Sequence, residues 1–262
     1  NHLIRIVPDN GVILANGDDP VVKELLPVSW TTVKFVGVGA DNDFVISEFE
    51  ESPDASRFSI SSEGGTVRFE TRLNGVFNAR NAAMALLAGG YVSYPENPMS
   101  FLKSADLKDY EGVARRQDVL FESDAIKVIE DFAHHPTAIR LCLESFKNCY
   151  PDHEVVAVFE PRSNTSATNV LETEFTAALG YADHVMIAPV HRGEIYTDEQ
   201  RINPTGMAEV LADTCRSAVA YNSKEALFDS LATEERAAKE VVLLFTNGSF
   251  GEPLQVYLRT LA

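Results

Sequence analysis

Cysteine is scarce in this sequence, and its spacing excludes two of its commonest roles. Cys142, Cys149 and Cys215 are an odd number of thiols in 262 residues, with neither a CxxC pair nor a Cys-His ligand spacing. The adjacent His134 and His135 supply no zinc site either, because neighbouring side chains on a turn point apart. We expect reduced cysteines in the core and no metal ligands in this sequence.

Basic residues are also in deficit, since 22 Lys and Arg stand against 39 Asp and Glu, a formal net charge of -17. Without a general basic field to draw in a polyanion, we expect no nucleic-acid partner. No apolar run approaches the about 18 residues of a membrane span, and no basic-then-apolar signal opens the chain. We therefore expect a soluble, cytoplasmic protein without a membrane partner. The composition favours no particular oligomeric state.

Three signatures of common enzyme classes are missing. The absence of GxSxG removes the nucleophile-elbow hydrolases, and the absence of GxGxxG removes the dinucleotide fingerprint. The phosphate loop GxxxxGK[ST] is missing too, and with it the lysine that usually reaches a triphosphate. Any phosphate bound by this chain must therefore meet local Arg or Lys side chains or backbone amides.

The sequence does contain a large apolar fraction, 45% of its residues. A chain of this length buries roughly three quarters of its unfolded surface, which allows a full core in one or two domains. After residue 112, short apolar strands alternate with helices of about ten residues, a pattern typical of a mostly parallel sheet covered on both faces. Strands are expected at 125–129, 154–159, 184–188, 218–221 and 241–246, and helices from Pro136 and at 168–179, 204–213, 223–232 and 251–261.

Residues 1–112 have a different pattern. A strand at 11–15 leads into a helix for which Asp19 and Pro20 suit the N-cap and the first helical position. Strand segments follow at 31–38, 43–49, 56–61 and 66–72. The last two alternate apolar and polar residues around a glycine-containing turn, as an antiparallel hairpin does. We therefore expect an α/β protein, with a mixed sheet first, a domain boundary near residue 112 and a mostly parallel sheet after it.

An alanine-rich helix follows the hairpin and is expected to end at Gly89 and Gly90. Asn78 can cap this helix, and Asn81 would lie on its first turn. A side-chain amide there either holds the loop or contacts the edge of a base. The spacing alone leaves both roles open.

Polar segments follow four of the expected parallel strands, at 129–136, 160–165, 189–194 and 246–251. Because parallel strands end at one edge of their sheet, we expect these segments to outline a single cleft. Asp131 can hydrogen-bond a ribose diol there. The segment 246–251 either cradles an anion or is a plain turn, and Arg115 and Arg116 are either solvated or face phosphates.

Five segments, taken in order, resemble the motifs of the Mur ligase family. They are Asn-Ala-Arg-Asn (78–81), Gly-Val-Ala-Arg-Arg-Gln (112–117), Asp-Phe-Ala-His-His-Pro (131–136), Phe-Glu-Pro-Arg-Ser-Asn-Thr (159–165) and Phe-Thr-Asn-Gly-Ser-Phe-Gly (245–251). Together they span nearly the whole chain. The last two favour the branch of the family that uses a tripeptide, although the branch that uses L-alanine has similar Asn-x-x-Asn and His-His-Pro blocks.

The resemblance implies a domain order and an activity. Residues 1–112 would be the C-terminal part of the central ATP-binding domain, and 113–262 the C-terminal Rossmann-like domain. Within the family, the closest match implies an enzyme that joins UDP-N-acetylmuramate to L-alanyl-γ-D-glutamyl-meso-diaminopimelate in peptidoglycan recycling, through an acyl phosphate made from ATP with Mg²⁺. The phosphate loop and the main Mg²⁺ ligands of the family would precede Asn1. We therefore expect this chain alone to turn over no ATP.

The resemblance also assigns roles to site residues. It places Asn78 and Asn81 at the adenine, Asp131 at the ribose and Arg116 at the terminal phosphate as a catalytic group, with His134 orienting either substrate. The residues expected to face the incoming peptide are Arg162, Ser163, Asn164, Thr165 and Ser249. Arg162 is able to pair bidentately with a carboxylate of that peptide.

Two alternatives stay open at this point. The first is another ligase of the same family that uses a different amine, such as UDP-N-acetylmuramate–L-alanine ligase. The second is a nucleotide- or peptide-binding module without chemistry of its own.

Overall fold

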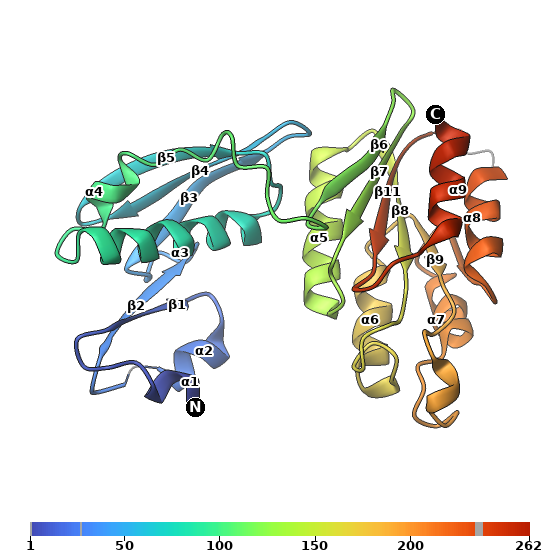
Figure 1. The fold of residues 1–262 in the computed structure, drawn as a ribbon, viewed down its shortest axis with the longest axis horizontal. Coiled ribbons are helices and arrows are strands. Elements are labelled where there is room, and N and C mark those ends of the chain that lie inside the picture. Colours follow the sequence, from blue (N-terminus) through green and yellow to red (C-terminus); the bar gives the residue numbers. More distant parts are fainter. Residues whose placement is uncertain (1, 27, 234–237) are drawn as a thin grey trace. The chain divides into compact units, whose positions relative to one another are not determined.

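The computed structural model describes residues 2–26, 28–233 and 238–262. The chain divides into two compact units, Asn1–Gly112 and Val113–Ala262 (Figure 1). Each unit is an α/β structure with its own sheet, so the expected fold class is confirmed. Within the described ranges, no helix has both the length and the apolar character needed to cross a membrane.

The first unit is built on a five-stranded sheet of order β1-β2-β3-β4-β5. The neighbours β1, β2 and β3 are parallel, whereas β3, β4 and β5 are antiparallel. The predicted hairpin is confirmed, with Ser62 opposite Gly65 at its turn. The elements are α1 His2–Arg5, β1 Val12–Asn16, α2 Pro20–Leu25, β2 Thr32–Gly37, β3 Phe44–Glu51, β4 Ser56–Ser62, β5 Gly65–Thr71, α3 Val76–Ser93 and α4 Met99–Leu102.

Helix α2 begins as its sequence predicts. Asp19 is the N-cap residue and its carboxylate accepts hydrogen bonds from the N–H groups of Val21 and Val22, while Pro20 occupies the first helical position. Helix α3 lies against the sheet, and its apolar side chains form one core with those of β2 to β5.

The prediction that Asn78 caps α3 is wrong. Gly75, whose φ of 93° favours glycine, is the N-cap residue, and no side chain caps the helix. Asn78 is the third helical residue, and its Nδ2 donates a hydrogen bond to the carbonyl of Asn74 at 2.8 Å. Asn81 consequently lies beyond the first turn and is exposed.

The expected helix end at Gly89 and Gly90 is also wrong, because α3 continues to Ser93. A Cβ atom on Gly90 would lie 2.7 Å from the carbonyl oxygen of Pro98. Glycine is therefore needed here for the close approach of the segment that precedes α4, and not for a helix end.

A half-buried ion pair ties α3 to the loops that follow β1 and β2. The carboxylate of Asp18 accepts hydrogen bonds from the N–H groups of Val38 and Gly39, both at 2.9 Å, and pairs with Arg80 at 2.6 Å. Burial alone would raise the pKa of Asp18, but these hydrogen bonds lower it to about 2. Arg80 lies between Asn78 and Asn81 in sequence, so this pair fixes the start of the helix that carries them.

The second unit contains a six-stranded sheet of order β10-β9-β8-β11-β7-β6. All neighbouring strands are parallel except β6 and β7. Its elements are β6 Asp118–Glu122, β7 Ile126–Asp131, α5 Pro136–Cys149, β8 His153–Phe159, η1 Asn169–Leu171, α6 Glu172–Leu179, β9 His184–Ile187, η2 Gly193–Ile195, α7 Pro204–Leu211, β10 Ser217–Ala220, α8 Lys224–Thr233, β11 Lys239–Phe245 and α9 Glu252–Leu261.

Helices cover both faces of this sheet, as predicted. Helices α5, α6 and α7 pack on one face, and α8 and α9 pack on the other (Figure 1). Alternate residues of β8 face opposite cores, since Ala157 belongs to the first and Val158 to the second. Cys142 and Cys149 are buried on α5, and burial raises the pKa of Cys142 well above its ordinary value.

The sequence did not predict strand β6. It is a short antiparallel edge strand whose register shifts between Val119 and Phe121. Both Val119 and Leu120 are exposed, so consecutive apolar residues replace the alternation that marks a half-buried strand.

The two adjacent glycines of α3 provide a matched test of the packing at its end. The nearest atoms to a Cβ on Gly89 would belong to the Phe101 ring, at 3.1 Å, whereas the nearest atom to one on Gly90 would be the backbone carbonyl oxygen of Pro98, at 2.7 Å. We expect Gly90→Ala to destabilise the first unit by about 1–3 kcal/mol, because the fixed carbonyl overrides the helix propensity gained. Gly89→Ala should be neutral or should stabilise by up to about 1 kcal/mol.

The measurement is urea unfolding followed by the fluorescence of Trp30, which is the single tryptophan of the sequence and lies in the first unit. Equal effects of the two substitutions would contradict this account.

Candidate functional site

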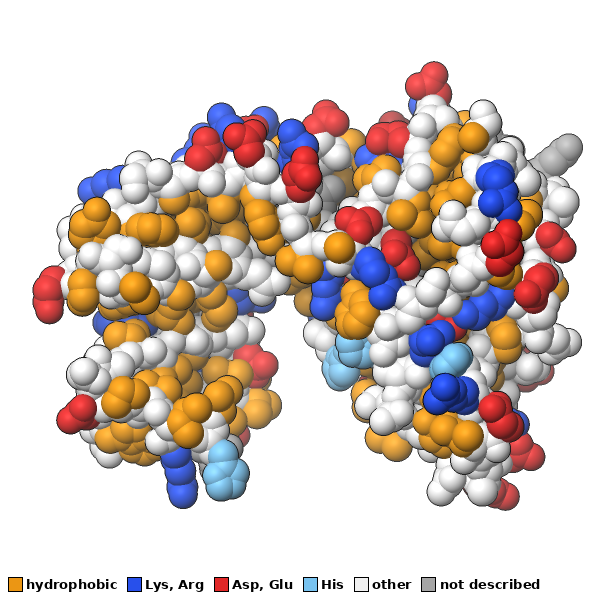
Figure 2. Space-filling view, in the orientation of Figure 1, with side chains coloured by type: hydrophobic (Ala, Val, Ile, Leu, Met, Phe, Trp, Pro, Cys, Tyr) orange, Lys and Arg blue, Asp and Glu red, His pale blue; other side chains and the backbone are white. Residues whose placement is uncertain are grey.

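The order of strands in the second unit places a topological switch point at the carboxyl end of β11. The helices that follow its neighbours β7 and β8 lie on one face of the sheet, whereas α9, which follows β11, lies on the other. Ligands bind in open α/β sheets where neighbouring connections leave to opposite faces in this way. In the space-filling view, Lys, Arg and His side chains gather beside the edge where these strands end (Figure 2).

A buried carboxylate occupies this position. The side chain of Glu160 is fully buried at the end of β8, and its Oε1 lies 2.5 Å from Nζ of Lys224 and 3.4 Å from Nη1 of Arg162. Its Oε2 accepts a hydrogen bond from the hydroxyl of Thr246, at the end of β11. We call Glu160, Arg162, His191, Lys224 and Thr246 the Glu160 cluster.

The loops after β8 and β11 fit closely around Arg162. Gly248 leaves the space that a Cβ would fill to the Arg162 side chain, whose Nε would lie only 1.9 Å from such an atom. The N–H of Gly248 donates to the hydroxyl of Thr246 at 2.9 Å. The neighbouring Oδ1 of Asn247 is buried and has no hydrogen-bond partner among the described residues.

His191 contributes a neutral imidazole to the cluster. Its Nδ1 lies 3.4 Å from Nη1 of Arg162. Burial lowers the pKa of His191, and the nearby charge of Arg162 lowers it further. The imidazole is therefore uncharged at neutral pH and can accept a hydrogen bond from the guanidinium.

Asp131 lies at the end of β7, next to β11, as predicted. The residue is 5% exposed, and its two oxygens accept hydrogen bonds from the N–H groups of Ala133 at 2.8 Å and Gln117 at 3.1 Å. Burial raises the pKa of Asp131, although these bonds and Arg116 act in the opposite direction. The carboxylate thus holds the backbone of two segments, and a ribose hydroxyl would have to use its remaining lone pairs.

The two adjacent arginines have different surroundings. Arg115 pairs with Glu130 at 3.3 Å and donates to the carbonyl of Thr246 at 3.0 Å, so it is anchored to the strand ends. Arg116 is exposed, with its guanidinium 5.1 Å from the centre of the Phe132 ring. Of the two, Arg116 is therefore the one available to a ligand.

The two histidines after β7 also differ. Nδ1 of His134 lies 2.8 Å from the carbonyl oxygen of Phe132, and its ring packs edge-on against the Phe132 ring. His135 is the N-cap residue of α5, where its Nδ1 accepts a hydrogen bond from the N–H of Thr137. Pro136 occupies the first helical position, as predicted.

The residues predicted to face a peptide divide into two groups. The hydroxyl of Ser163 is used within its own loop, where it contacts the buried hydroxyl of Ser166 at 2.8 Å. Asn164, Thr165 and Ser249 are exposed. Of the predicted site residues, Asn78 and Asn81 belong to the first unit and all the others to the second.

Sequence reasoning missed Lys224. It is the first residue of α8, and neither a motif nor a spacing connects it with Glu160. Glu160 and His191 lie in segments that the sequence did single out, but no role was predicted for either. These three residues come together only through the order of the strands in the sheet, which the sequence does not reveal.

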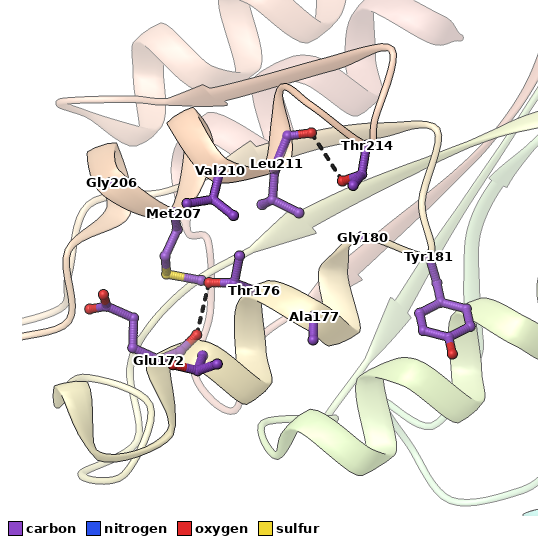
Figure 3. Close-up of a pocket in the computed structure, with 11 residues that line it drawn as sticks. Glu172, Thr176, Ala177, Gly180, Tyr181, Gly206, Met207, Val210, Leu211 and Thr214 are labelled. Carbon is purple, nitrogen blue, oxygen red and sulfur yellow. Dashed lines mark hydrogen bonds between the residues drawn. The ribbon is translucent and has the colours of Figure 1, made fainter.

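Two cavities of the second unit are lined by residues outside the Glu160 cluster. One of about 410 Å³ lies at the carboxyl ends of β9 and β10, lined in part by Val190, Gly193 and Glu194 of the loop that carries His191. Another, of about 510 Å³, lies between α6 and α7, lined by Met207, Leu211 and their neighbours (Figure 3). Neither lining includes a residue of the Glu160 cluster, and that of the second cavity is mostly apolar, so we place the chemistry in neither.

Among the described residues, no group of three His, Cys, Asp or Glu side chains could hold a metal ion. We therefore assign no Mg²⁺ ligand to the described residues.

Family models cover most of the chain. The model of the Mur ligase middle domain matches residues 1–89, and that of the Mur ligase glutamate ligase domain matches residues 115–248. The chain belongs to the Mur ligase family. Members of this family are ATP-dependent ligases, and the resemblance of the five sequence motifs is thereby confirmed.

Curated Mur ligases of two kinds are similar to the chain. The UDP-N-acetylmuramate–L-alanyl-γ-D-glutamyl-meso-2,6-diaminoheptandioate ligase of Haemophilus influenzae is 30% identical over 96% of this chain and 52% of its own length. The UDP-N-acetylmuramate–L-alanine ligase of Alkaliphilus metalliredigens is 31% identical over 78% of this chain and 44% of its own. The chain spans about half the length of these Mur ligases.

Solved Mur ligases share the fold. A murein peptide ligase of Psychrobacter arcticus has a TM-score of 0.65 and 23% identity over 99% of this chain and 53% of its own. The MurF ligase of Thermotoga maritima, solved in complex with ADP, has a TM-score of 0.67 and 16% identity over 97% of this chain and 54% of its own. At these identities the likeness concerns the fold alone.

The charge on Arg162 predicts how His191 titrates. We expect Arg162→Met to raise the pKa of His191 towards its ordinary value, because the substitution removes a neighbouring positive charge. Arg192→Met is the matched control, since Arg192 also lowers this pKa but contributes less than Arg162. The pKa values are measured by NMR titration of the imidazole C–H resonance, and a larger change in the control variant would overturn the assignment.

Proposed function

We propose that the chain is part of an ATP-dependent amide ligase that joins UDP-N-acetylmuramate to L-alanyl-γ-D-glutamyl-meso-diaminopimelate. The observation that carries the proposal is the likeness to the Haemophilus influenzae ligase over nearly the whole chain. The structure supports it through the Glu160 cluster, because a peptide with several carboxylates needs localised cations in a protein whose net charge is -17.

In this proposal residues 1–112 belong to the ATP-binding domain and residues 113–262 to the domain that receives the peptide. ATP, used with Mg²⁺, supplies the phosphoryl group that activates the muramate carboxylate. No Mg²⁺ ligand is assigned among the described residues, and no step is assigned to a metal held by this chain. The proposed setting is peptidoglycan recycling in the cytoplasm.

The proposed mechanism relies on charge and alignment. Phosphoryl transfer and the later attack of the peptide amine both build negative charge on oxygen, so positioned cations stabilise both transition states. Arg116 is assigned to the terminal phosphate because it is the exposed member of its pair. Asn78 and Asn81 are assigned to the adenine, Asp131 to the ribose, and His134 to the orientation of a substrate.

Arg162 is the residue assigned to a peptide carboxylate. Its guanidinium is held by Glu160 and His191 through Nη1 and packs against Gly248 at Nε, which leaves Nη2 for a ligand. Asn164, Thr165 and Ser249 line the same strand ends and are assigned to the rest of the peptide, with Ser163 keeping the loop in shape.

A UDP-N-acetylmuramate–L-alanine ligase is the second candidate, favoured by the 31% identity to the Alkaliphilus metalliredigens enzyme. A binding module without chemistry remains the third.

The acceptor is tested by calorimetric titration of the 262-residue chain. We expect the tripeptide to bind at least about tenfold more tightly than L-alanine, because two further residues and their carboxylates contribute contacts. The same preparation should hydrolyse no ATP, since its sequence lacks the phosphate loop. Equal or tighter binding of L-alanine would favour the second candidate, and ATP hydrolysis would contradict the assigned domain roles.

A further inference from the structure

The position of Lys224 is at odds with the helix that carries it. It is the first residue of α8, where the partial positive charge of a helix N-terminus disfavours a cation. Its side chain is nonetheless only 22% exposed. Local helix energetics therefore do not explain a lysine here, and such conflicts between a residue and its local structure are typical of functional sites.

Contacts with other elements do account for its position. Nζ of Lys224 lies 2.5 Å from Oε1 of Glu160 and donates to the carbonyl of Ser249 at 2.9 Å. It also lies 5.5 Å from the centre of the Phe250 ring. Lys224 is thus held between the loops after β8 and β11, which are the loops assigned to the acceptor.

The charges of the cluster do not cancel. Two cations, Arg162 and Lys224, approach the same oxygen of one carboxylate, and His191 adds no charge at neutral pH. One positive charge is therefore left over. Both cationic side chains are partly open, at 30% and 22% exposed, so this charge is within reach of a ligand.

Hydrogen-bond donors are also left over. Lys224 has three N–H groups, and the described residues provide two oxygen acceptors for them. Arg162 has five, and the side-chain hydrogen bonds that it makes within the described residues all involve Nη1. A ligand carboxylate has two oxygens, enough to accept from both residues at once.

We propose that Lys224 binds an acceptor carboxylate together with Arg162, and that the buried Glu160 holds the two cations side by side. This inference rests on the proposed function for the identity of the acceptor, but the site itself does not. The chemistry it recognises is a carboxylate of an amino acid or peptide.

The experiment is a double-mutant cycle in which one change is made in the protein and the other in the ligand. The affinity of each pair is measured by calorimetry on the 262-residue chain. The ligands are the tripeptide and three analogues, each with a carboxamide in place of one carboxylate. We expect Lys224→Met to weaken tripeptide binding at least about tenfold and to leave one analogue unaffected, namely the one that lacks the carboxylate bound by Lys224. An unchanged affinity for the tripeptide, or an equal loss with every ligand, would overturn the proposal.

Three further variants separate binding from folding. Lys224→Arg keeps the charge and should restore most of the affinity. Lys224→Met combined with Glu160→Gln leaves no unpaired carboxylate in the interior, so it should fold by circular dichroism yet bind at least as weakly as Lys224→Met. Lys239→Met is the matched control, because Lys239 is exposed at the opposite end of β11 and should bind like the original chain.

A second measurement does not depend on the tripeptide. Sodium acetate should shift the imidazole resonance of His191 in the original chain and in Lys239→Met, but not in Lys224→Met. If acetate shifts the His191 resonance but the tripeptide does not bind, the proposed function is wrong and the carboxylate site is confirmed. If acetate gives no shift, or if inorganic phosphate gives a larger one at equal concentration, the carboxylate site is wrong.

Discussion

The second unit depends on a carboxylate that water does not reach. Glu160 has no exposed side-chain surface, and an unpaired charge in that position would cost several kcal/mol. Its partners, Arg162, Lys224 and Thr246, come from three different segments of the chain. Satisfying one buried charge therefore fixes the geometry of the whole strand-end edge.

The same arrangement explains how an acidic protein presents a cationic site. The chain as a whole carries a net charge of -17, so its overall field does not attract anions. Local recognition has to come from a few cations whose side chains are already ordered. Because Glu160 and the carbonyl of Ser249 hold Lys224 in place, little side-chain entropy remains to be lost when a ligand binds.

The sequence predicted the elements whose signals are local. Strands β8 and β11 contain continuous apolar runs because both faces of the sheet are covered, and Asp19 with Pro20 marks a helix start by side-chain chemistry alone. The prediction from sequence failed where contacts between distant residues determine the local structure. Gly90 is a glycine because Pro98 packs against it, and Asn78 turns back to Asn74 while Gly75 begins the helix.

The candidate site shows the same division. The polar segments after β7, β8 and β11 could be located from the sequence, because parallel strands bring their ends together. The hydrogen bonds and the exposure of each side chain could not be predicted from the sequence. Asp131 is occupied by backbone N–H groups, Arg115 is anchored while Arg116 is exposed, and Lys224 reaches the site from a helix that carries no motif.

The most direct test of the role of Glu160 is a double-mutant cycle with Lys224. The quantity measured is the free energy of unfolding of the second unit in urea, followed by circular dichroism. Each of Glu160→Gln and Lys224→Met should destabilise the unit alone, and the pair together should cost about 1–3 kcal/mol less than the sum of the two. Free energies that add to within about 0.5 kcal/mol would show that the two residues do not depend on each other, and would contradict the account.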